Sequence, residues 1–248
     1  MDPQVVLVTG ALTGIGRATA TAFAKAGARV VVSGRRDDAG RSLVAELHEL
    51  NAEAEFVRAD VRHEEDVRNL MDQAVARFGQ LDVAVNNAGT LGTPGPLTEQ
   101  SAESYAAIFD TNVLGLVLSM KHELRVMQAQ GRGSIVNLSS IVGHKALPGD
   151  PLYVASKHAV EGLTKSAALE AAGSGVRVNV VAPGPIETGM LNRFTGTDER
   201  KAGLVGGVPL KRTGRPEEVA QTIVFLSSDK PPFITGASFA VDGGKTAQ

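Results

Sequence analysis

The 248-residue sequence contains no cysteine, no tryptophan and only two tyrosines. Without cysteine the chain can form no disulfide, and it offers no thiolate ligand for zinc or for an iron–sulfur cluster. Its net charge of −2 provides no basic field for nucleic acid and no polybasic patch for anionic lipid. We therefore expect no nucleic-acid partner, no membrane partner and no cysteine-based metal site.

Long apolar runs are also missing, and none approaches the roughly 18 residues that a membrane-spanning helix needs. A strand-like segment begins at Val5, which leaves no room for a signal peptide, so we expect a cytoplasmic protein. The histidines show no metal-ligand spacing; they stand at positions 48, 63, 122, 144 and 158. We therefore predict no catalytic metal.

Short β-branched segments alternate with longer segments whose apolar residues recur every three or four positions. The predicted strands are 5–8, 29–33, 53–58, 81–85, 134–138, 177–181 and 238–241. The predicted helices include 16–26, 38–50, 64–78 and 155–172. Such alternation predicts an α/β fold, with one doubly wound domain over residues 1–248 and helices on both faces of a parallel sheet. The less regular, Gly- and Thr-rich stretch 184–207 suggests a mobile substrate loop at about 188–210.

A glycine-rich loop follows the first predicted strand. Gly10, Gly14 and Gly16 form a Gly-x-x-x-Gly-x-Gly pattern before a helical segment. Glycines let the backbone turn tightly and approach a ligand, while a helix N-terminus attracts a pyrophosphate. The pattern is neither a P-loop nor the usual Gly-x-Gly-x-x-Gly spacing. A purely structural turn is the alternative, but the position in a βαβ unit favours phosphate binding.

The end of the second predicted strand bears on which dinucleotide is bound. Folds that prefer NAD usually place an acidic residue there to bind the ribose 2′-hydroxyl. This chain has Gly34 instead, followed by Arg35 and Arg36. A guanidinium can bind a 2′-phosphate in bidentate fashion, so we predict NADP(H) as cofactor, with NAD(H) as the alternative. The competing interpretation is two solvated arginines, one of them paired with Asp37 or Asp38.

Tyr153 and Lys157 are four residues apart, so in a helix both side chains leave the same face. A phenol normally keeps its proton up to about pH 10. An ammonium one turn away stabilises the phenolate, which predicts a lowered pKa for Tyr153 and an acid/base role. This spacing is common by chance, and a solvated Lys beside a half-buried Tyr is the alternative.

Together these motifs make the chain resemble the short-chain dehydrogenase/reductase family over essentially its whole length. The matching segments are Thr9-Gly10…Gly14-Ile15-Gly16, Asp60-Val61, Asn86-Asn87-Ala88-Gly89, Asn112, Ser139-Ser140, Tyr153-x-x-x-Lys157 and Pro183-Gly184-Pro185-Ile186-Glu187-Thr188. The resemblance implies a Rossmann-type fold with a seven-stranded parallel sheet, usually in a homotetramer. It also implies a nicotinamide cofactor and reversible alcohol/carbonyl chemistry.

The resemblance also implies roles for four catalytic residues. Tyr153 is the general acid for carbonyl reduction and the base for alcohol oxidation, and Lys157 lowers its pKa and holds the nicotinamide ribose. Ser140 polarises the carbonyl oxygen, with Ser139 as the competing candidate; the interval of thirteen residues before Tyr153 favours Ser140. Asn112 anchors a water in a proton relay to Lys157. Two donors, Tyr153 and Ser140, would then converge on the oxygen that becomes negative.

On the cofactor side, the resemblance implies that Asp60 and Val61 contact adenine. Asn87, Ala88 and Gly89 line the adenosine ribose, and Ile186 and Thr188 touch the nicotinamide carboxamide. The full predicted cofactor-binding set is Gly10, Thr13, Gly14, Ile15, Gly16, Arg35, Arg36, Asp60, Val61, Asn87, Ala88, Gly89, Tyr153, Lys157, Pro183, Gly184, Ile186 and Thr188.

The C-terminal segment 241–248 is similar to the ends of certain tetrameric bacterial alcohol dehydrogenases that hold a structural Mg²⁺ near a C-terminal Gln. A structural Mg²⁺ at Gln248 is therefore one expectation, and a solvated or subunit-packed tail is the other. The hydride chemistry itself requires no metal.

Three segments are expected to select the substrate: 90–97, 141–152 and 190–210. They contribute mainly apolar side chains, namely Leu91, Ile141, Val142, Leu147, Leu152, Met190, Leu191 and Phe194, with few charges such as Lys145 and Asp150. An apolar pocket suits a hydrophobic or aryl ketone, so we predict an NADPH-dependent ketoreductase or alcohol dehydrogenase. The alternatives within the family are a glucose-type sugar dehydrogenase and a 3-oxoacyl-carrier-protein reductase. A non-catalytic dinucleotide-binding sensor is the alternative of a different class.

Overall fold

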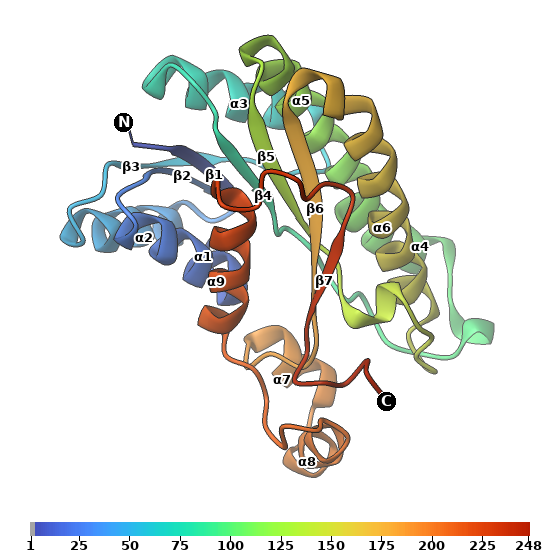
Figure 1. The fold of residues 1–248 in the computed structure, drawn as a ribbon. Helices are drawn as coiled ribbons and strands as arrows, with labels where there is room; N and C mark the ends of the chain where they lie inside the picture. Colours follow the sequence, from blue (N-terminus) through green and yellow to red (C-terminus); the bar gives the residue numbers. More distant parts are fainter. Residues whose placement is uncertain (1–2) are drawn as a thin grey trace.

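The computed structural model describes residues 3–248, and within them seven parallel strands form one sheet in the order β3-β2-β1-β4-β5-β6-β7 (Figure 1). The strands are β1 Val5–Thr9, β2 Arg29–Gly34, β3 Ala54–Arg58, β4 Val83–Asn86, β5 Gly133–Leu138, β6 Val176–Pro183 and β7 Ser238–Val241. Every predicted strand is present and ends within two residues of its predicted bounds. The prediction of a doubly wound α/β fold is confirmed.

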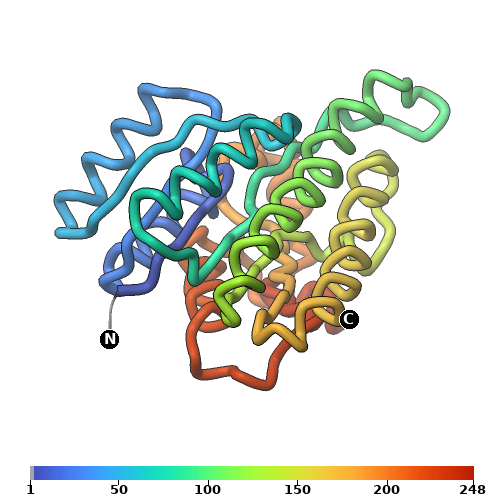
Figure 2. Tube along the Cα trace, turned by 90° about the horizontal axis from the view of Figure 1, so that it is seen from above, coloured from blue at the N-terminus to red at the C-terminus, as the bar shows by residue number. Residues whose placement is uncertain are grey.

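Helices cover both faces of the sheet. On one face lie α1 Gly14–Lys25, α2 Asp37–Glu49 and α9 Pro216–Ser227; on the other lie α3 Glu64–Phe78, α5 Gly115–Gln130 and α6 Pro151–Ala171. Figure 2 shows α3, α5 and α6 side by side, in agreement with their mutual contacts. The shorter helices are α4 Ala102–Phe109, α7 Gly189–Thr195 and α8 Asp198–Gly206. No helix in the described chain is long and apolar enough to cross a membrane.

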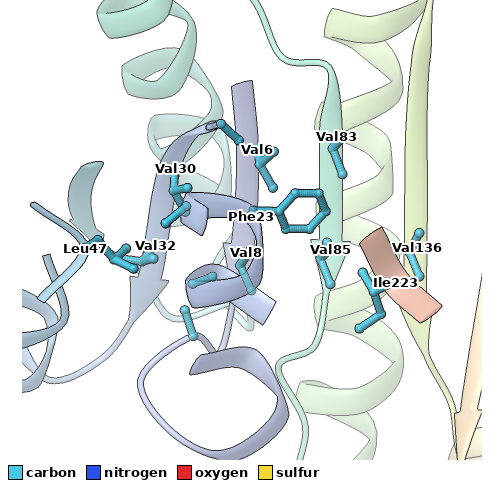
Figure 3. Close-up of a cluster of buried hydrophobic side chains, with 14 of the residues drawn as sticks. Val6, Val8, Phe23, Val30, Val32, Leu47, Val83, Val85, Val136 and Ile223 are labelled. Carbon is cyan, nitrogen blue, oxygen red and sulfur yellow. The ribbon is translucent and has the colours of Figure 1, made fainter. Parts of the chain in front are cut away.

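Alternation along each strand divides the core into two layers. Val6 and Val8 of β1 pack with Phe23 of α1 and Ile223 of α9, whereas Leu7 faces the opposite layer (Figure 3). Successive side chains of a strand point to opposite faces, so an all-apolar strand fills both layers. Burying each such side chain contributes about 1.5–3 kcal/mol.

The prediction that the segment 188–210 is an irregular loop is wrong, because the helices α7 and α8 occupy most of it. Each helix begins at a threonine cap. Thr188 Oγ1 accepts the Leu191 N–H at 3.3 Å, and Thr197 Oγ1 accepts the Arg200 N–H at 3.3 Å. The capping hydroxyls satisfy helix N–H groups that would otherwise lack partners, which allows short helices in a Gly- and Thr-rich stretch.

Parallel strands bring their carboxyl ends to one edge of the sheet. β1 lies between β2 and β4, so the chain leaves β1 and β4 toward opposite faces of the sheet. In open α/β sheets this reversal point forms a crevice in which ligands bind. The glycine loop after β1 and the segment 86–89 after β4 meet there, which places the predicted site at this edge.

Candidate active site

The glycine loop after β1 is pressed against the end of β4. Gly10 has φ of 62°, and a Cβ on Gly16 would lie 2.4 Å from the Gly10 carbonyl oxygen. Asn87 Nδ2 donates to the carbonyl oxygens of Thr9 and Gly10 at 3.1 and 2.9 Å. Only glycine at position 16 lets the loop close this tightly. The two hydrogen bonds from the Asn87 side chain then hold the closed loop in place.

The N-terminus of α1 fits a dinucleotide pyrophosphate. Thr13 is the N-cap and is exposed, but its side chain makes no capping hydrogen bond, and the first turn contains no acidic residue. The first N–H groups of a helix need partners and carry partial positive charge, which favours a phosphate. Gly14 lies beside Thr188, since a Cβ on Gly14 would be 3.1 Å from the Thr188 methyl. Two predicted cofactor segments are thus brought together.

The end of β2 has no room for an acidic residue. A Cβ on Gly34 would lie 2.6 Å from Leu12 Cδ1, and the Leu12 side chain is buried. Arg35 and Arg36 follow and are exposed. The Arg35 side chain is 69% exposed and its Nη1 stands 3.8 Å from Asp60 Oδ2, so it remains free to bind another anion.

Asp60, at the end of β3, has a partner that sequence reasoning missed. Arg62 donates to both carboxylate oxygens, with Nη2–Oδ2 at 2.6 Å and Nε–Oδ1 at 3.0 Å. Hydrogen bonding by Arg62 holds the pKa of Asp60 below its ordinary value. Asp60 also lies near Arg35, so it connects the predicted 2′-phosphate and adenine positions. The Asp-x-Arg spacing of these two residues is the feature of the sequence that could have indicated this ion pair.

Tyr153 and Lys157 lie on the first turns of α6, which begins at Pro151 rather than at the predicted residue 155. Proline is well suited to the first turn of a helix, where its missing N–H has no partner to lose. Lys157 is buried, its Nζ donates to the Leu138 carbonyl oxygen at 2.8 Å, and it stands 5.7 Å from the centre of the Tyr153 ring. The helix therefore brings the two side chains together as predicted.

The expected lowering of the Tyr153 pKa is wrong for this structure. Burial raises the pKa of Tyr153 to about 12, the Asp150 carboxylate acts in the same direction, and a hydrogen bond with Ser140 opposes them. Lys157 does not offset the burial, because its ammonium binds Leu138 and lies over the ring. At neutral pH Tyr153 is therefore a protonated phenol. Asp150, buried just before α6, is a second residue whose influence on the site was missed.

The two candidate serines have different partners. Ser139 is buried, and its Oγ donates to the Lys157 carbonyl oxygen at 3.3 Å, which ties β5 to α6. Ser140 is partly exposed, and its Oγ accepts the Val142 N–H at 3.3 Å and interacts with the Tyr153 phenol. The structure therefore favours Ser140 as the residue beside the reacting oxygen.

Asn112 lies in a π-helical turn, Asp110–Leu114, between α4 and α5. Its Oδ1 accepts the Thr90 N–H at 2.8 Å, and Nδ2 donates to Thr90 O at 2.8 Å and to Ser156 Oγ at 3.0 Å. Both amide N–H groups are thus used, so a water held by Asn112 would have to donate to Oδ1 or to the backbone carbonyl. A hollow lined in part by Val61, Ala88, Asn112 and Lys157 joins the predicted cofactor and catalytic residues.

The segment after β6 completes the edge of the site. Ile186 is buried, and Thr188 caps α7. A Cβ on Gly184 would lie 2.8 Å from Cα of Asp242, so the C-terminal segment packs directly on Pro183-Gly184. Among the predicted substrate residues, Ile141, Val142 and Leu191 are buried, whereas Leu91, Leu147, Leu152, Met190 and Phe194 are partly exposed.

The predicted Mg²⁺ finds no support in the C-terminal segment. Within residues 3–248 no group of three His, Asp or Glu side chains could hold a metal ion. Asp242 instead accepts hydrogen bonds from Gly244 N and Thr246 N at 2.9 and 2.7 Å. Gln248 Nε2 donates to Gly207 O at 2.9 Å. The tail is thus held by its own backbone and by the end of α8.

Known proteins resemble this chain in both sequence and fold. A family model described as enoyl-(acyl carrier protein) reductase matches residues 10–246. The cis-4-hydroxycyclohexanecarboxylate dehydrogenase of Sinomonas cyclohexanicum is 43% identical over 98% of this chain and 97% of that protein. The cyclohexanol dehydrogenase of Acinetobacter sp. (strain SE19) is 40% identical over 99% of this chain and 96% of that protein.

A solved structure described as ElxO with NADP bound superposes with a TM-score of 0.94 at 36% identity, and the match covers 100% of both chains. The chain therefore belongs to the short-chain dehydrogenase/reductase family, a family of oxidoreductases that act on CH–OH groups.

Proposed function

We propose that the protein interconverts an apolar, carbocyclic ketone and its secondary alcohol with NADP(H). One observation carries the proposal: Tyr153, Lys157 and Ser140 converge at the edge of the sheet where the glycine loop and the free N-terminus of α1 also lie. A dinucleotide placed on that helix and a carbonyl placed beside Tyr153 would meet at this edge.

The chain's own residues perform the proton chemistry. Tyr153 carries its proton at neutral pH because burial raises its pKa to about 12, so it can donate to a carbonyl oxygen. Ser140 supplies a second donor to the same oxygen. Lys157 supplies positive charge behind the ring. When bound, the nicotinamide supplies or accepts the hydride.

NADP(H) is proposed over NAD(H) because of the end of β2. Leu12 fills the space that an acidic side chain at position 34 would need, and the exposed Arg35 and Arg36 are available to a 2′-phosphate. The related structure with NADP bound supports the same assignment.

The substrate class follows from the partly exposed apolar side chains and from the relatives. Met190 and Phe194 lie on α7 beside the predicted cofactor segment, and neither is fully buried. Two relatives at 40–43% identity are named for alcohols on a cyclohexane ring. A ring alcohol presents a CH–OH group on an apolar body, which suits such a pocket.

A substrate and cofactor panel tests the proposal. Cyclohexanol, cis-4-hydroxycyclohexanecarboxylate, glucose and a 3-oxoacyl thioester, with their partner ketones or alcohols, would each be assayed with NADP(H) and NAD(H). We expect the ring alcohols to give the highest kcat/KM with NADP⁺. Preference for the thioester would favour the alternative, a 3-oxoacyl-carrier-protein reductase.

The arginine assignment has its own variants. Arg35→Ser and Arg36→Ser should each raise KM for NADP⁺ about tenfold or more, since each removes a charge-assisted contact to the 2′-phosphate. Neither should change KM for NAD⁺. Arg41→Ser is the matched control, because Arg41 pairs with Asp38 on the exposed face of α2. An equal effect of Arg41→Ser, or none from Arg35→Ser and Arg36→Ser, would contradict the assignment.

We further propose one domain, a closing substrate segment at 188–210, a cytoplasmic location and a homotetramer. The single sheet from β1 to β7 supports one domain. Exposed apolar side chains support self-association, with Leu169 of α6 at 81% and Phe233 at 103% exposure. Light scattering after size exclusion measures the mass, and a monomer would contradict the tetramer.

A further inference from the structure

Glu161 lies one helical turn after Lys157 on α6, and its side chain is buried. One carboxylate oxygen, Oε1, stands 3.2 Å from His144 Nε2 and accepts a hydrogen bond from Ser238 Oγ at 3.2 Å. The other, Oε2, is buried without a hydrogen-bond partner. A buried carboxylate with an unpaired oxygen is costly unless a positive charge lies nearby.

Lys157 is the matching half of this arrangement. Its side chain is 6% exposed, and its ammonium donates to the Leu138 carbonyl oxygen. Residues four apart share a helix face, so a buried cation and a buried anion are stacked along α6. Each has its own hydrogen-bond partners, and the attraction between them acts through the protein interior, where charges are screened weakly.

We propose that Glu161 is a positioning residue of the reaction, whose buried negative charge keeps the Lys157 side chain in its ammonium form behind Tyr153. The proposal rests on the role given to Lys157 in the proposed function. It extends the Tyr-x-x-x-Lys pair by one more turn, to Tyr-x-x-x-Lys-x-x-x-Glu on one face of α6.

The electrostatics of the neighbouring groups agree with this arrangement. Burial lowers the pKa of Lys157 to about 8, and the charge of Glu161 acts in the opposite direction. The groups that face the two side chains are the Tyr153 ring from α6, His144 from the segment after Ser140, and Ser238 from β7. Without the Glu161 charge, Lys157 would lose its proton closer to neutral pH.

Glu161 also packs against the segment that carries Ser140. A Cβ on Gly143 would lie 3.1 Å from Glu161 Cγ and 2.5 Å from Ser139 Oγ, so this contact leaves no spare room. A purely structural role is therefore the competing explanation. Glu161→Gln keeps the size of the side chain and removes its charge, which separates the two explanations.

The pH dependence of carbonyl reduction tests the proposal. We expect the alkaline limb of kcat/KM to move about one pH unit lower in Glu161→Gln, because removing a neighbouring opposite charge lowers the pKa of an ammonium by about that much. Glu161→Asp withdraws the charge by one methylene and should give a smaller shift in the same direction. Glu170→Gln, which removes an exposed carboxylate from the far end of α6, should leave the limb in place.

A second measurement does not depend on turnover. In cofactor-free protein with ¹³C-labelled lysine, the Lys157 signal, assigned by its loss in Lys157→Arg, should titrate at lower pH in Glu161→Gln than in the wild type. Unchanged titration and an unchanged limb in Glu161→Gln, or in Glu161→Asp if the Gln variant fails to fold, would overturn the proposal. Full activity in Tyr153→Phe would instead overturn the proposed function.

Discussion

At the scale of single residues, Tyr153 has a natural control in Tyr105, the other tyrosine of the chain. Tyr153→Phe should lower kcat by about 10²–10⁴-fold, because a positioned acid contributes that much to proton transfer. NADPH binding, followed by its fluorescence, should persist. Tyr105 is half exposed on α4 and stacks on Phe109, so Tyr105→Phe should leave kcat unchanged. Comparable losses in both variants would contradict the assignment of Tyr153.

Glu123 predicts a pH effect on stability. It is fully buried on α5, and burial raises its pKa to about 8, whereas an unfolded Glu titrates near 4.3. The folded protein thus keeps this proton while the unfolded chain releases it, so stability should fall as pH rises from about 4.3 to about 8. Asn86 Nδ2 donates to Glu123 Oε2 at 2.9 Å, and Gln can accept the same bond.

Glu123→Gln should therefore raise the free energy of unfolding at pH 8 by roughly 3–5 kcal/mol, since the folded and unfolded pKa values differ by nearly four units of about 1.4 kcal/mol each. At pH 5 the difference should nearly vanish. Urea unfolding at the two pH values measures both. An equal difference at pH 5 and pH 8 would show that Glu123 is not held protonated by the fold.

Sequence reasoning located residues whose spacing along the chain is itself the signal, such as Tyr153 and Lys157. It missed Arg62 and Asp150, and its prediction that Lys157 lowers the pKa of Tyr153 was wrong. Those depend on which groups meet after folding: Lys157 reaches the carbonyl of Leu138, nineteen residues earlier, and the partly buried Tyr153 is subject to the charge of Asp150. Glu161 had a signal, one more step of four residues, that spacing alone could have found.

At the scale of elements, the glycine loop and α6 give a matched pair of substitutions. Gly16→Ala would place Cβ 2.4 Å from the Gly10 carbonyl oxygen, so we expect a loss of about 1–3 kcal/mol in stability and weaker NADPH binding. Gly162 is exposed in α6 with no atom within 4 Å of an added Cβ. Gly162→Ala should add about 0.5–1 kcal/mol. Thermal unfolding measures the stability of both variants, and NADPH fluorescence measures their cofactor binding. Unweakened NADPH binding in Gly16→Ala would contradict the loop geometry.

Strands were easier to predict than the helices near the site. β1, β2 and β6 are rich in Val, which favours strands, whereas glycines in α7 and α8 and threonines at or beside their ends favour loops. Their helical form depends on the caps at Thr188 and Thr197 and on packing that the local sequence does not reveal. The side chain of Asn112, in the π-helical turn Asp110–Leu114, bonds to Thr90 and Ser156, partners that the local sequence does not reveal.

At the scale of the whole molecule, the C-terminus ties together segments that are far apart in the chain. Lys245 Nζ donates to Gly207 O at 2.7 Å, Gln248 reaches the same oxygen, and Lys145 Nζ donates to Lys245 O at 3.0 Å. The tail thus joins the end of α8 to the segment after Ser140. In Figure 1 the C-terminus lies at the end of the molecule where α7 and α8 are found.

Removing residues 245–248 breaks two or more hydrogen bonds that hold the end of α8, each of about 0.5–1.5 kcal/mol. Because α8 belongs to the segment expected to select the substrate, KM for the ketone should rise about five- to tenfold. We expect kcat to change less than KM, because Tyr153 and Lys157 lie on α6. Lys165→Met, on an exposed part of α6, is the control for loss of one lysine. Steady-state kinetics measures both constants, and an unchanged KM would exclude this role of the tail.

The contact between Leu12 and Gly34 constrains how this chain could evolve or be redesigned. An acidic residue introduced at position 34 alone would meet the Leu12 side chain 2.6 Å from its Cβ, so the first step toward NAD preference would damage the fold. Shortening Leu12 first would open a cavity under the glycine loop with no immediate benefit. We expect each single substitution to be unfavourable and the two together to relieve the contact, which is reciprocal sign epistasis. A cofactor switch in this chain is therefore a two-mutation path, and libraries that vary position 34 without position 12 should fail to find it.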